Sequence, residues 1–333
     1  MKKFFTYGFI FFSTLRLIAQ DIHFTQFQSA PLYLNPAFAG ANSDSRLSMI
    51  YRNQWWNIPG TYNSFLVSYD QYFFDFRSAV GIILASDNAG SMNFGNKFIG
   101  IDYAYDYKFD RYWTISSGIK AVYGYRSLTF DKLIFGDQLL RGASTSIQTI
   151  LPERQSYLDI SWGTLLYSNN HFIGITIDHL NRPNQSYLGY ESRLPIKYSI
   201  HAAKTFYIFE HGGSGKKTDK PVIIGLFQYK FQAKFDQLDI GAIYKTPNYF
   251  AGIYYRGIPM LKHYKAGYPN NDALCFLAGI HFKTFDIAYS YDATISWLTY
   301  KTGGSNEISL TYQFYNPHKA KKHRSKIIPC AKF

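Results

Sequence analysis

Six aspartates are the residues of this chain whose chemistry could support acid–base catalysis. They alternate with apolar or aromatic residues and so fall on the polar parity of their segments: Asp102, Asp106, Asp159, Asp239, Asp286 and Asp292. A hydrolase needs two carboxyl groups within reach of one substrate, and sequence spacing brings no two of these together. Balancing cations occur in similar segments: Lys108, Lys197 and Lys245. We therefore interpret these side chains as the lining of a polar interior and predict no catalytic residue.

The histidines and one glycine-rich stretch do not form a recognisable metal or phosphate site. Four histidines in the body of the chain lack the spacing of zinc ligands: His171, His179, His201 and His211. Residues 212–218 read GGSGKKT, but a phosphate-binding loop needs glycine at 210 and serine or threonine at 217, where Glu210 and Lys217 stand. The sequence therefore predicts no metal, no cofactor and no enzyme.

Alternation of apolar and polar residues is the main structural signal. Residues 99–109 place Ile, Tyr and Phe on one parity and Gly, Asp, Ala and Lys on the other, and residues 284–314 repeat this on two strands joined by a loop. Alternate side chains of a strand point to opposite faces, so each strand has one apolar and one polar face. Fourteen strands are predicted: 45–52, 62–72, 79–86, 97–108, 112–126, 156–167, 171–179, 196–207, 222–232, 237–245, 249–256, 273–282, 284–292 and 307–314.

The lengths of the connections favour one of two architectures. Connections that follow even-numbered strands are mostly short, near Asp110, Asn169, Pro247 and Lys283. Those that follow odd-numbered strands are mostly long: 53–61, 87–96, 128–155, 180–195, 258–272 and 293–306. Two connections break the rule, a long one around Gly213 and a short one at 233–236. This asymmetry is typical of transmembrane barrels and not of a soluble β-sandwich. The predicted fold is an all-β transmembrane antiparallel β-barrel of about 14 strands with both termini in the periplasm.

The composition and the first residues agree with export to an outer membrane. Aromatic residues make up 19% of the chain, with 30 Tyr and 29 Phe, which suits the aromatic girdles of membrane barrels. Residues 1–19 begin with two lysines, continue with an apolar run and end in alanine, as a secretory signal peptide does. A short membrane anchor is the alternative, but the uncharged run is too short to span a bilayer.

The formal charge of +13 lies mostly outside the predicted barrel. The signal segment contributes three of these charges and the tail six, through Lys319, Lys321, Lys322, Arg324, Lys326 and Lys332. The remaining +4 does not indicate a nucleic-acid partner. The basic tail is either solvated or a partner-binding end. Cys275 and Cys330 are far apart in sequence and are expected to be free thiols.

The predicted organisation is a signal peptide at 1–19, an irregular segment at 20–44, the barrel at 45–315 and a basic periplasmic tail at 316–333. Prolines, an asparagine and a glycine interrupt the segment at 20–44, which either caps or enters the barrel mouth or is a poorly ordered leader.

Three motifs carry a resemblance to a known family. They are LNPAFAG at 34–40, YRNQW at 51–55 and GGSNEISL at 303–310. In this order they resemble the PorP/SprF family of outer-membrane proteins of Bacteroidetes, over essentially the whole mature chain. The resemblance implies an outer-membrane barrel of the type IX secretion system, in some members linked to gliding motility. Implied partners are the periplasmic ring and peptidoglycan-binding components of that machine, or a secreted adhesin-like client. The family's usual Cys-Pro pair near the last residues stands here in the reverse order, as Pro329-Cys330.

The motif residues are the candidate structural positions: Asn35, Pro36, Gly40, Arg52, Asn53, Gln54, Trp55, Gly303, Gly304 and Glu307. Proline fixes φ and extends the residue before it, so Asn35-Pro36 predicts a turn with a flexible exit at Gly40. Arg52 either pairs with an internal carboxylate or lies at a solvated rim. Trp55 and Trp56 are expected to anchor a loop at the bilayer interface.

The functional hypothesis is a non-enzymatic secretion component that docks periplasmic machine parts or a client. The candidate partner-binding tail residues are Lys319, Lys321, Lys322, Arg324 and Lys326, and the candidate lumen-lining residues are Asp102, Asp106, Lys108, Asp286 and Asp292. A general diffusion porin is the alternative, favoured by the polar strand face; steady conductance in a planar bilayer would identify it.

Overall fold

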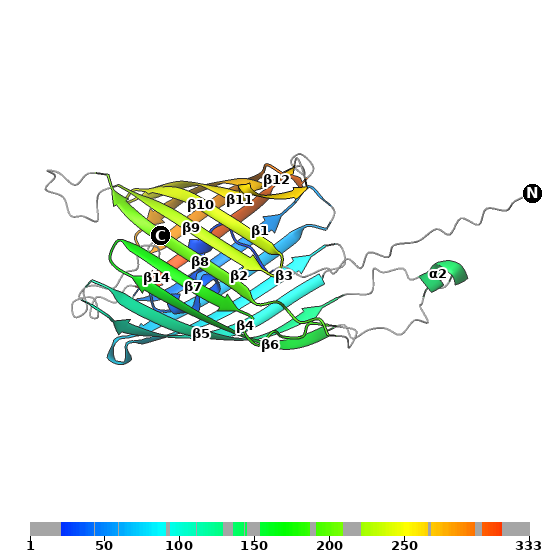
Figure 1. The fold of residues 1–333 in the computed structure, drawn as a ribbon, viewed down its shortest axis with the longest axis horizontal. Coiled ribbons are helices and arrows are strands. Elements are labelled where there is room, and N and C mark those ends of the chain that lie inside the picture. The colour runs from blue at the N-terminus through cyan, green and yellow to red at the C-terminus, as the bar shows by residue number, and fades with distance from the viewer. Residues whose placement is uncertain are drawn as a thin grey trace, which may run out of the picture.

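Fourteen antiparallel strands close into one barrel in the computed structural model (Figure 1). The structure describes residues 21–314 except 43, 59, 91–93, 111, 129–135, 143, 145–153, 187–190, 209–220, 266–267 and 297–301. The strands are β1 (Ser45–Gln54), β2 (Tyr62–Phe73), β3 (Ser78–Ala89), β4 (Phe94–Lys108), β5 (Thr114–Ser127), β6 (Arg154–Tyr167), β7 (His171–Asp178), β8 (Lys197–Tyr207), β9 (Val222–Gln232), β10 (Phe235–Lys245), β11 (Tyr249–Lys265), β12 (Tyr268–Phe282), β13 (Phe285–Thr294) and β14 (Ser305–Phe314). The predicted fold class is confirmed.

The helical turns are few and short. Three lie before the barrel, η1 (Phe27–Ser29), α1 (Pro31–Leu34) and η2 (Pro36–Phe38); η3 (Phe74–Phe76) joins β2 to β3, and α2 (Gly136–Arg141) lies between β5 and β6. In the described part of the chain, no helix is both long and apolar enough to cross a membrane.

Each strand pairs with its sequence neighbours, and β1 pairs with β14 to close the ring. The closing register runs from Ser45 opposite Phe314 to Gln54 opposite Ser305. A closed ring leaves no row of unpaired backbone groups, which hydrocarbon would not satisfy.

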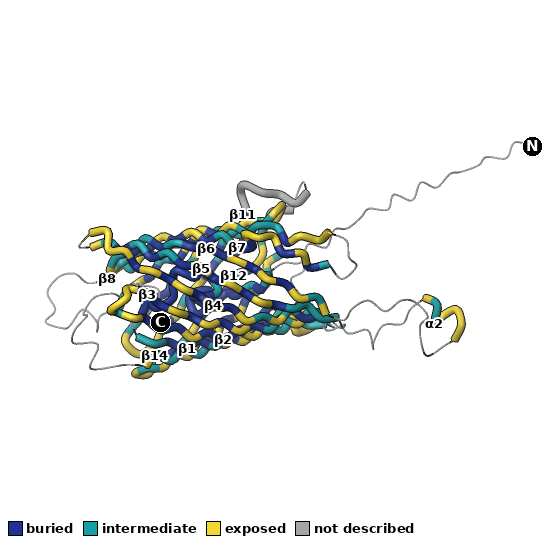
Figure 2. Tube along the Cα trace, turned by 90° about the horizontal axis from the view of Figure 1, so that it is seen from below, coloured by how far each residue is buried: buried dark blue, intermediate teal, exposed yellow. Residues whose placement is uncertain are grey.

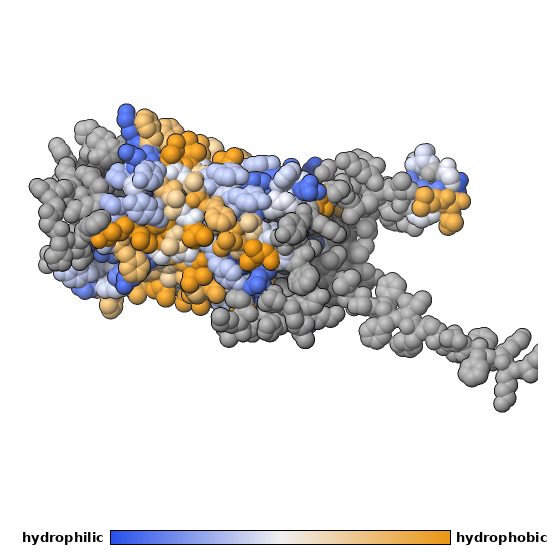
Figure 3. All heavy atoms as spheres, turned by 90° about the horizontal axis from the view of Figure 1, so that it is seen from above, coloured by the Kyte–Doolittle hydropathy of each residue, from blue (hydrophilic) through white to orange (hydrophobic). Residues whose placement is uncertain are grey.

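Alternation along the strands separates an apolar outer face from a polar inner face. On β4, Tyr103 is 50% exposed and the adjacent Asp102 is 0% exposed. A similar alternation of buried and exposed positions runs along most of the other strands (Figure 2). Apolar residues gather over the outside of the barrel wall (Figure 3). The apolar parity identified in the sequence therefore faces outward.

The two ends of the barrel differ. The short-turn end carries η3 and the connections 109–113, 168–170, 246–248 and 283–284, together with the longer 208–221. The long-loop end carries the connections 55–61, 128–153, 179–196 and 295–304. The connection around Gly213 is long and the one between β9 and β10 is short, against the general trend. Neither hides a missed strand, because the fourteen strands occur in the predicted order.

One predicted loop is wrong. The sequence placed an outer loop at 258–272, whereas β11 continues to Lys265 and β12 begins at Tyr268. The pairing persists through register shifts after Arg256, Ile258 and His263. Gly257 has a φ of +139°, which side chains rarely adopt, so glycine permits the first irregularity.

The first described residue, Asp21, does not lie at the same end of the barrel as the start of β1. Both Ser45 and Phe314 lie at the short-turn end. The segment before β1 crosses the lumen, however, so that Asp21 lies at the long-loop end, where it contacts His179 and the first residue of β8, Lys197. Residues 1–20 and 315–333 lie outside the described residues, so the prediction that both termini are periplasmic stays a prediction.

Candidate functional site

Residues 21–42 lie inside the barrel, and we call them the luminal segment (Figure 1). Nearly all of its described residues are buried, including Gln26, Leu32 and Asn35 at 0% exposure. Its apolar side chains join two clusters with inward side chains of the wall. Phe27 and Phe38 belong to the cluster that includes Leu165, and Leu32 to the one that includes Ile83. The segment is thus a packed core of the barrel.

Local sequence explains the path of the luminal segment. Pro31 begins α1, and Pro36 begins η2, positions where a missing N–H costs nothing. Asn35 between them is extended, and its side-chain oxygen accepts a hydrogen bond from the N–H of Ala37 at 2.9 Å. Gly40 has a φ of +68° and donates its N–H to Asp70 at 2.8 Å. The predicted turn at Asn35-Pro36 and exit at Gly40 both occur.

Asn35 also joins the luminal segment to the barrel wall. Its amide nitrogen donates to the carbonyls of Thr164 and Ile175, each at 3.2 Å, and lies 3.1 Å from Nε2 of His201. A side chain at Gly163 would overlap the oxygen of Asn35. Glycine in the wall therefore allows this close approach.

Two buried arginines organise a charged cluster near the long-loop end. Arg52 pairs with Asp292 at 2.9 Å and with Glu307 at 3.0 Å. Arg256 pairs with Asp239 at 2.8 Å and with the same Asp292 at 3.0 Å. Of the two placements left open for Arg52, the structure shows the internal pair. Buried ions are tolerated only when paired and hydrogen-bonded, and here cations and acids alternate.

The luminal segment completes this cluster. The hydroxyl of Thr25 donates to Asp292 at 2.7 Å and accepts from Arg52 and Arg256, both at 2.8 Å. The backbone N–H groups of Thr25 and Gln26 donate to Glu307 at 2.9 and 2.8 Å. Four charged side chains from four strands therefore hold one point of the segment, and Asp239 on a fifth strand holds Arg256.

The motifs from opposite ends of the sequence meet at the β1–β14 seam. Arg52 stands opposite Glu307, and Asn53 and Gln54 stand opposite Asn306 and Ser305 of the third motif. The N–H of Trp55 donates to the carbonyl of Gly304 at 2.8 Å. Both glycines, 303 and 304, have positive φ, near +73°. The structure thus brings the second and third motifs together.

Trp56 differs from Trp55 in its surroundings. Its indole N–H donates to the carbonyl of Gly303 at 2.7 Å, and the side chain is 55% exposed. Trp55 packs edge-to-face on Tyr62 with 5.3 Å between ring centroids. The bond from Trp56 ties the β1–β2 connection to the β13–β14 connection, whereas the ring of Trp55 packs on the start of β2.

The predicted lumen-lining acids all face inward and are buried: Asp102, Asp106, Asp286 and Asp292. Their partners differ. Asp106 accepts from Tyr167 at 3.2 Å, Asp286 contacts His281, and both oxygens of Asp102 lack a hydrogen-bond partner. Lys108 is the exception, since it is exposed at the end of β4.

A second charged group ties the start of the luminal segment to the wall. Asp21 contacts Lys197 at 2.5 Å and His179 at 2.9 Å. Burial raises the pKa of Asp21, but Lys197 and His179 outweigh this and hold that pKa well below its usual range. Burial lowers the pKa of His179, but Asp21 and Asp159 outweigh it and raise that pKa to about 10. Both groups are therefore charged at neutral pH.

Sequence reasoning missed part of this site. Arg256 shares its parity with Phe250 and Tyr254, so the apolar–polar alternation that identified the aspartates does not single it out. Nothing in the spacing of Thr25 or Gln26 indicates a partner more than 260 residues away.

Among the described residues, no group of three or more His, Cys, Asp or Glu could hold a metal ion. Cys275 is buried and free. The basic tail, Cys330 and the signal segment lie outside the described residues.

A closed fourteen-stranded barrel with an apolar outer face and a packed interior defines a β-barrel of the outer-membrane type. The chain belongs to the family of type IX secretion system membrane proteins PorP/SprF, whose model matches residues 17–312. Membership and fold together support an outer-membrane location and a place among the components of that secretion system.

Solved structures with a similar outline are barrel proteins. The CymD monoaromatic hydrocarbon channel is 11% identical with a TM-score of 0.49, over 86% of this chain and 93% of that chain. The Acinetobacter baumannii outer membrane protein Omp33 is 7% identical with a TM-score of 0.43, over 83% and 100%. The P. putida toluene transporter TodX is 10% identical with a TM-score of 0.45, over 86% and 94%. No curated protein matches this chain.

Proposed function

We propose that this chain is a non-enzymatic, non-conducting component of the type IX secretion machinery. It serves as a membrane-embedded docking body for periplasmic machine components or for a secreted surface-protein client. Residues 1–19 direct its export and are cleaved. In this role the barrel supplies a rigid platform, and the connections at its two ends supply the contacts.

The observation that carries this proposal is the packed luminal segment. A diffusion porin needs a continuous water-filled path, whereas residues 21–42 run from one end of this lumen to the other. Buried ion pairs and apolar contacts hold the segment at several depths. A path for solutes would require those contacts to break, so a docking role is favoured over the porin alternative.

Planar-bilayer recording tests this choice. The purified full-length chain should insert without opening a steady current, while a general porin measured under the same conditions conducts continuously. A persistent ohmic conductance from the full-length protein would favour the porin reading instead.

The basic tail is the proposed contact for the periplasmic ring and peptidoglycan-binding components. Its cations, Lys319, Lys321, Lys322, Arg324 and Lys326, follow β14, which ends at the short-turn end. Closely spaced cations favour an acidic partner surface. A client would then use the long-loop end, and in some cells the assembly would serve gliding motility.

Truncation after Phe314 tests the tail. Crosslinking in native membranes should recover fewer periplasmic machine components with the truncated chain than with the full chain. The matched variant replaces the five cations with glutamine and keeps the length. Equal recovery from all three chains would remove the tail from the proposed role.

A further inference from the structure

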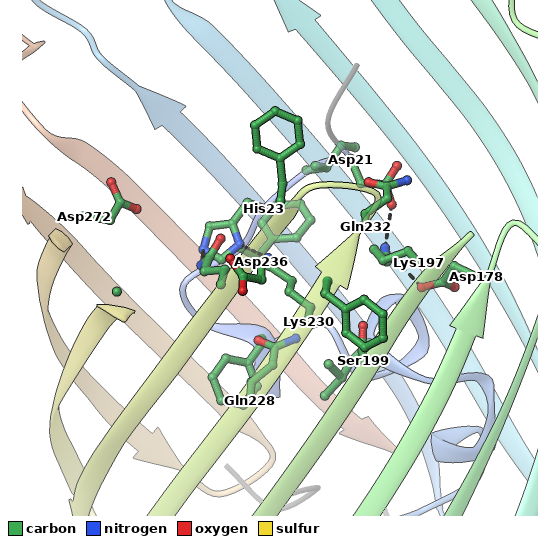
Figure 4. Close-up of a pocket in the computed structure, with 18 of the residues that line it drawn as sticks. Asp21, His23, Asp178, Lys197, Ser199, Gln228, Lys230, Gln232, Asp236 and Asp272 are labelled. Carbon is green, nitrogen blue, oxygen red and sulfur yellow. Dashed lines mark hydrogen bonds and ion pairs between the residues drawn. The ribbon is translucent and has the colours of Figure 1, made fainter. Parts of the chain in front are cut away.

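A cavity of about 400 Å³ lies between the luminal segment and strands β8 to β12 at the long-loop end (Figure 4). Its floor is apolar and comes from the luminal segment, with Phe24, Phe27 and Leu34. Its wall is polar and includes two lysines, Lys197 and Lys230. Asp272 is a lining residue whose side chain is 56% exposed, so the cavity reaches solvent at this rim.

The two lysines differ in their partners. Lys197 is neutralised by Asp21 at 2.5 Å and by Asp178 at 3.1 Å. The ammonium of Lys230 instead contacts Nδ1 of His23, and it forms no ion pair with a carboxylate of the described chain. Asp239 is already engaged by Arg256 at 2.8 Å. Lys230 is therefore the amine of this cavity that no carboxylate of the described residues neutralises, and a bound anion would favour its protonated form.

His23 does not supply the missing negative charge. An imidazole is either neutral or cationic in proteins, so it brings no negative charge to the cavity. Since Lys230 has only N–H groups to offer, its contact with Nδ1 of His23 uses that nitrogen as the acceptor. An ammonium in this partly dry position gains most from an anionic ligand.

Gln228 adds a second unsatisfied group on the same wall. Its side chain is 6% exposed, it lines the cavity, and its oxygen has no hydrogen-bond partner. Residues two apart on a strand point to the same face, so Gln228 and Lys230 stand side by side on β9. A buried acceptor of this kind requires a donor. A ligand that complements this wall therefore carries both an anionic group for Lys230 and an N–H donor for Gln228.

We propose that this cavity binds a short peptide end. The terminal carboxylate meets Lys230, a backbone N–H donates to Gln228, and an apolar side chain rests on Phe24, Phe27 and Leu34. Further amide side chains of the lining, Gln232 and Asn271 among them, match a peptide backbone. An acyl carboxylate satisfies Lys230 but brings no N–H for Gln228. The assignment concerns the cavity alone and stands apart from the docking role.

Calorimetric titration of the full chain in detergent tests the assignment. The probes are acetyl-Leu-Phe with a free carboxylate and the same dipeptide as its amide. The amide should bind about 10-fold more weakly or worse, because it loses a charge-assisted hydrogen bond. Lys230→Gln should weaken the acid by a similar factor, and Lys230→Arg should restore most of it.

Lys234→Gln is the matched control. It removes the same charge four residues away, from an exposed position in the β9–β10 turn that does not line the cavity. Binding by this variant should equal that of the unaltered chain. Heat-modifiable migration on gels verifies that each variant forms a barrel. Should Lys230→Gln not fold, Gln228→Leu provides the test, since it should weaken acetyl-Leu-Phe without weakening dodecanoate.

Three results would overturn the assignment: equal affinity for the acid and the amide, no binding of either, or tighter binding of dodecanoate than of acetyl-Leu-Phe. The last would assign the cavity to an acyl carboxylate. None of these results bears on conductance or on recovery of machine components.

Discussion

At the scale of single residues, Arg52 is a central ion-pair partner in the buried charged cluster of the barrel interior. It bonds to two acids of the wall and to the hydroxyl of Thr25, all out of contact with water. Buried ion pairs add little net stability, but removing one partner leaves the others unmatched. Arg52 therefore compensates the cost of burying Asp292 and Glu307, and it adds little to the net stability of the barrel.

Arg52→Met should destabilise the barrel by about 3–5 kcal/mol, because Asp292 and Glu307 lose a buried partner. Urea unfolding in detergent micelles measures the change. Arg193→Met is the control, since Arg193 pairs with Glu191 where both are more than half exposed, and it should cost at most about 1 kcal/mol. Similar losses for both variants would contradict the account.

His179 predicts a pH dependence at the long-loop end. Its pKa is raised to about 10 in the folded chain, against roughly 6.5 when unfolded. The stabilisation from its pairs is thus fully present below about pH 6.5 and is lost as pH rises through about 10. Thermal unfolding between pH 6 and pH 10 should show this loss.

The control separates His179 from other titrating groups. His179→Gln should flatten the loss of stability over that pH range, while His171→Gln should leave it unchanged. His171 lies at the start of β7, at the short-turn end, against the ring of Trp113. An unchanged slope in His179→Gln would remove the ion pairs from the explanation.

At the scale of elements, the luminal segment and the wall are fitted to each other by glycine. Inward glycines at 118 and 163 approach Pro36, Ala37 and Asn35 so closely that a Cβ on either would overlap them. Neither position is a turn, and neither has positive φ. Because these two glycines have no side chain, the luminal segment can pack directly against the backbone of the wall.

Gly163→Ala should displace Asn35 and loosen the luminal segment without opening the strand pairing. Limited proteolysis should then cut residues 21–42 faster, with a lower unfolding temperature. Gly225→Ala is the matched control, because its added carbon would meet Phe206 at an ordinary 3.5 Å. Equal protease resistance in both variants would argue against a fitted contact.

The strands could be predicted from the sequence because apolar and polar residues alternate along most of them. The prediction failed at 258–272, where prolines, glycine and asparagines resemble a loop although the backbone continues pairing through bulges. The sequence did not decide whether residues 20–44 enter the barrel mouth or form a poorly ordered leader. The helical turns η1, α1 and η2 are too short to show a helical repeat of apolar residues. The charged cluster was only partly visible, because its members come from five strands and register across a closed sheet decides which of them meet.

At the scale of the whole molecule, the luminal segment decides whether the barrel conducts. Deleting residues 21–42 should convert a silent barrel into one that passes ions, because the polar inner faces of the strands would then line water. Planar-bilayer recording measures the current. The deletion must still show heat-modifiable migration, and a folded but silent deletion would mean that something besides the segment blocks the lumen.

The path of the luminal segment also restricts the order of assembly. Asp21 and Ser45 lie at opposite mouths, and the ladder between β1 and β14 is the contact that completes the ring. A segment that bonds to this many buried charges of the wall and packs into two apolar clusters does not thread through a finished cylinder. The sheet must instead wrap around it, so the luminal segment is a template for the barrel, and the final hairpin seals it in place.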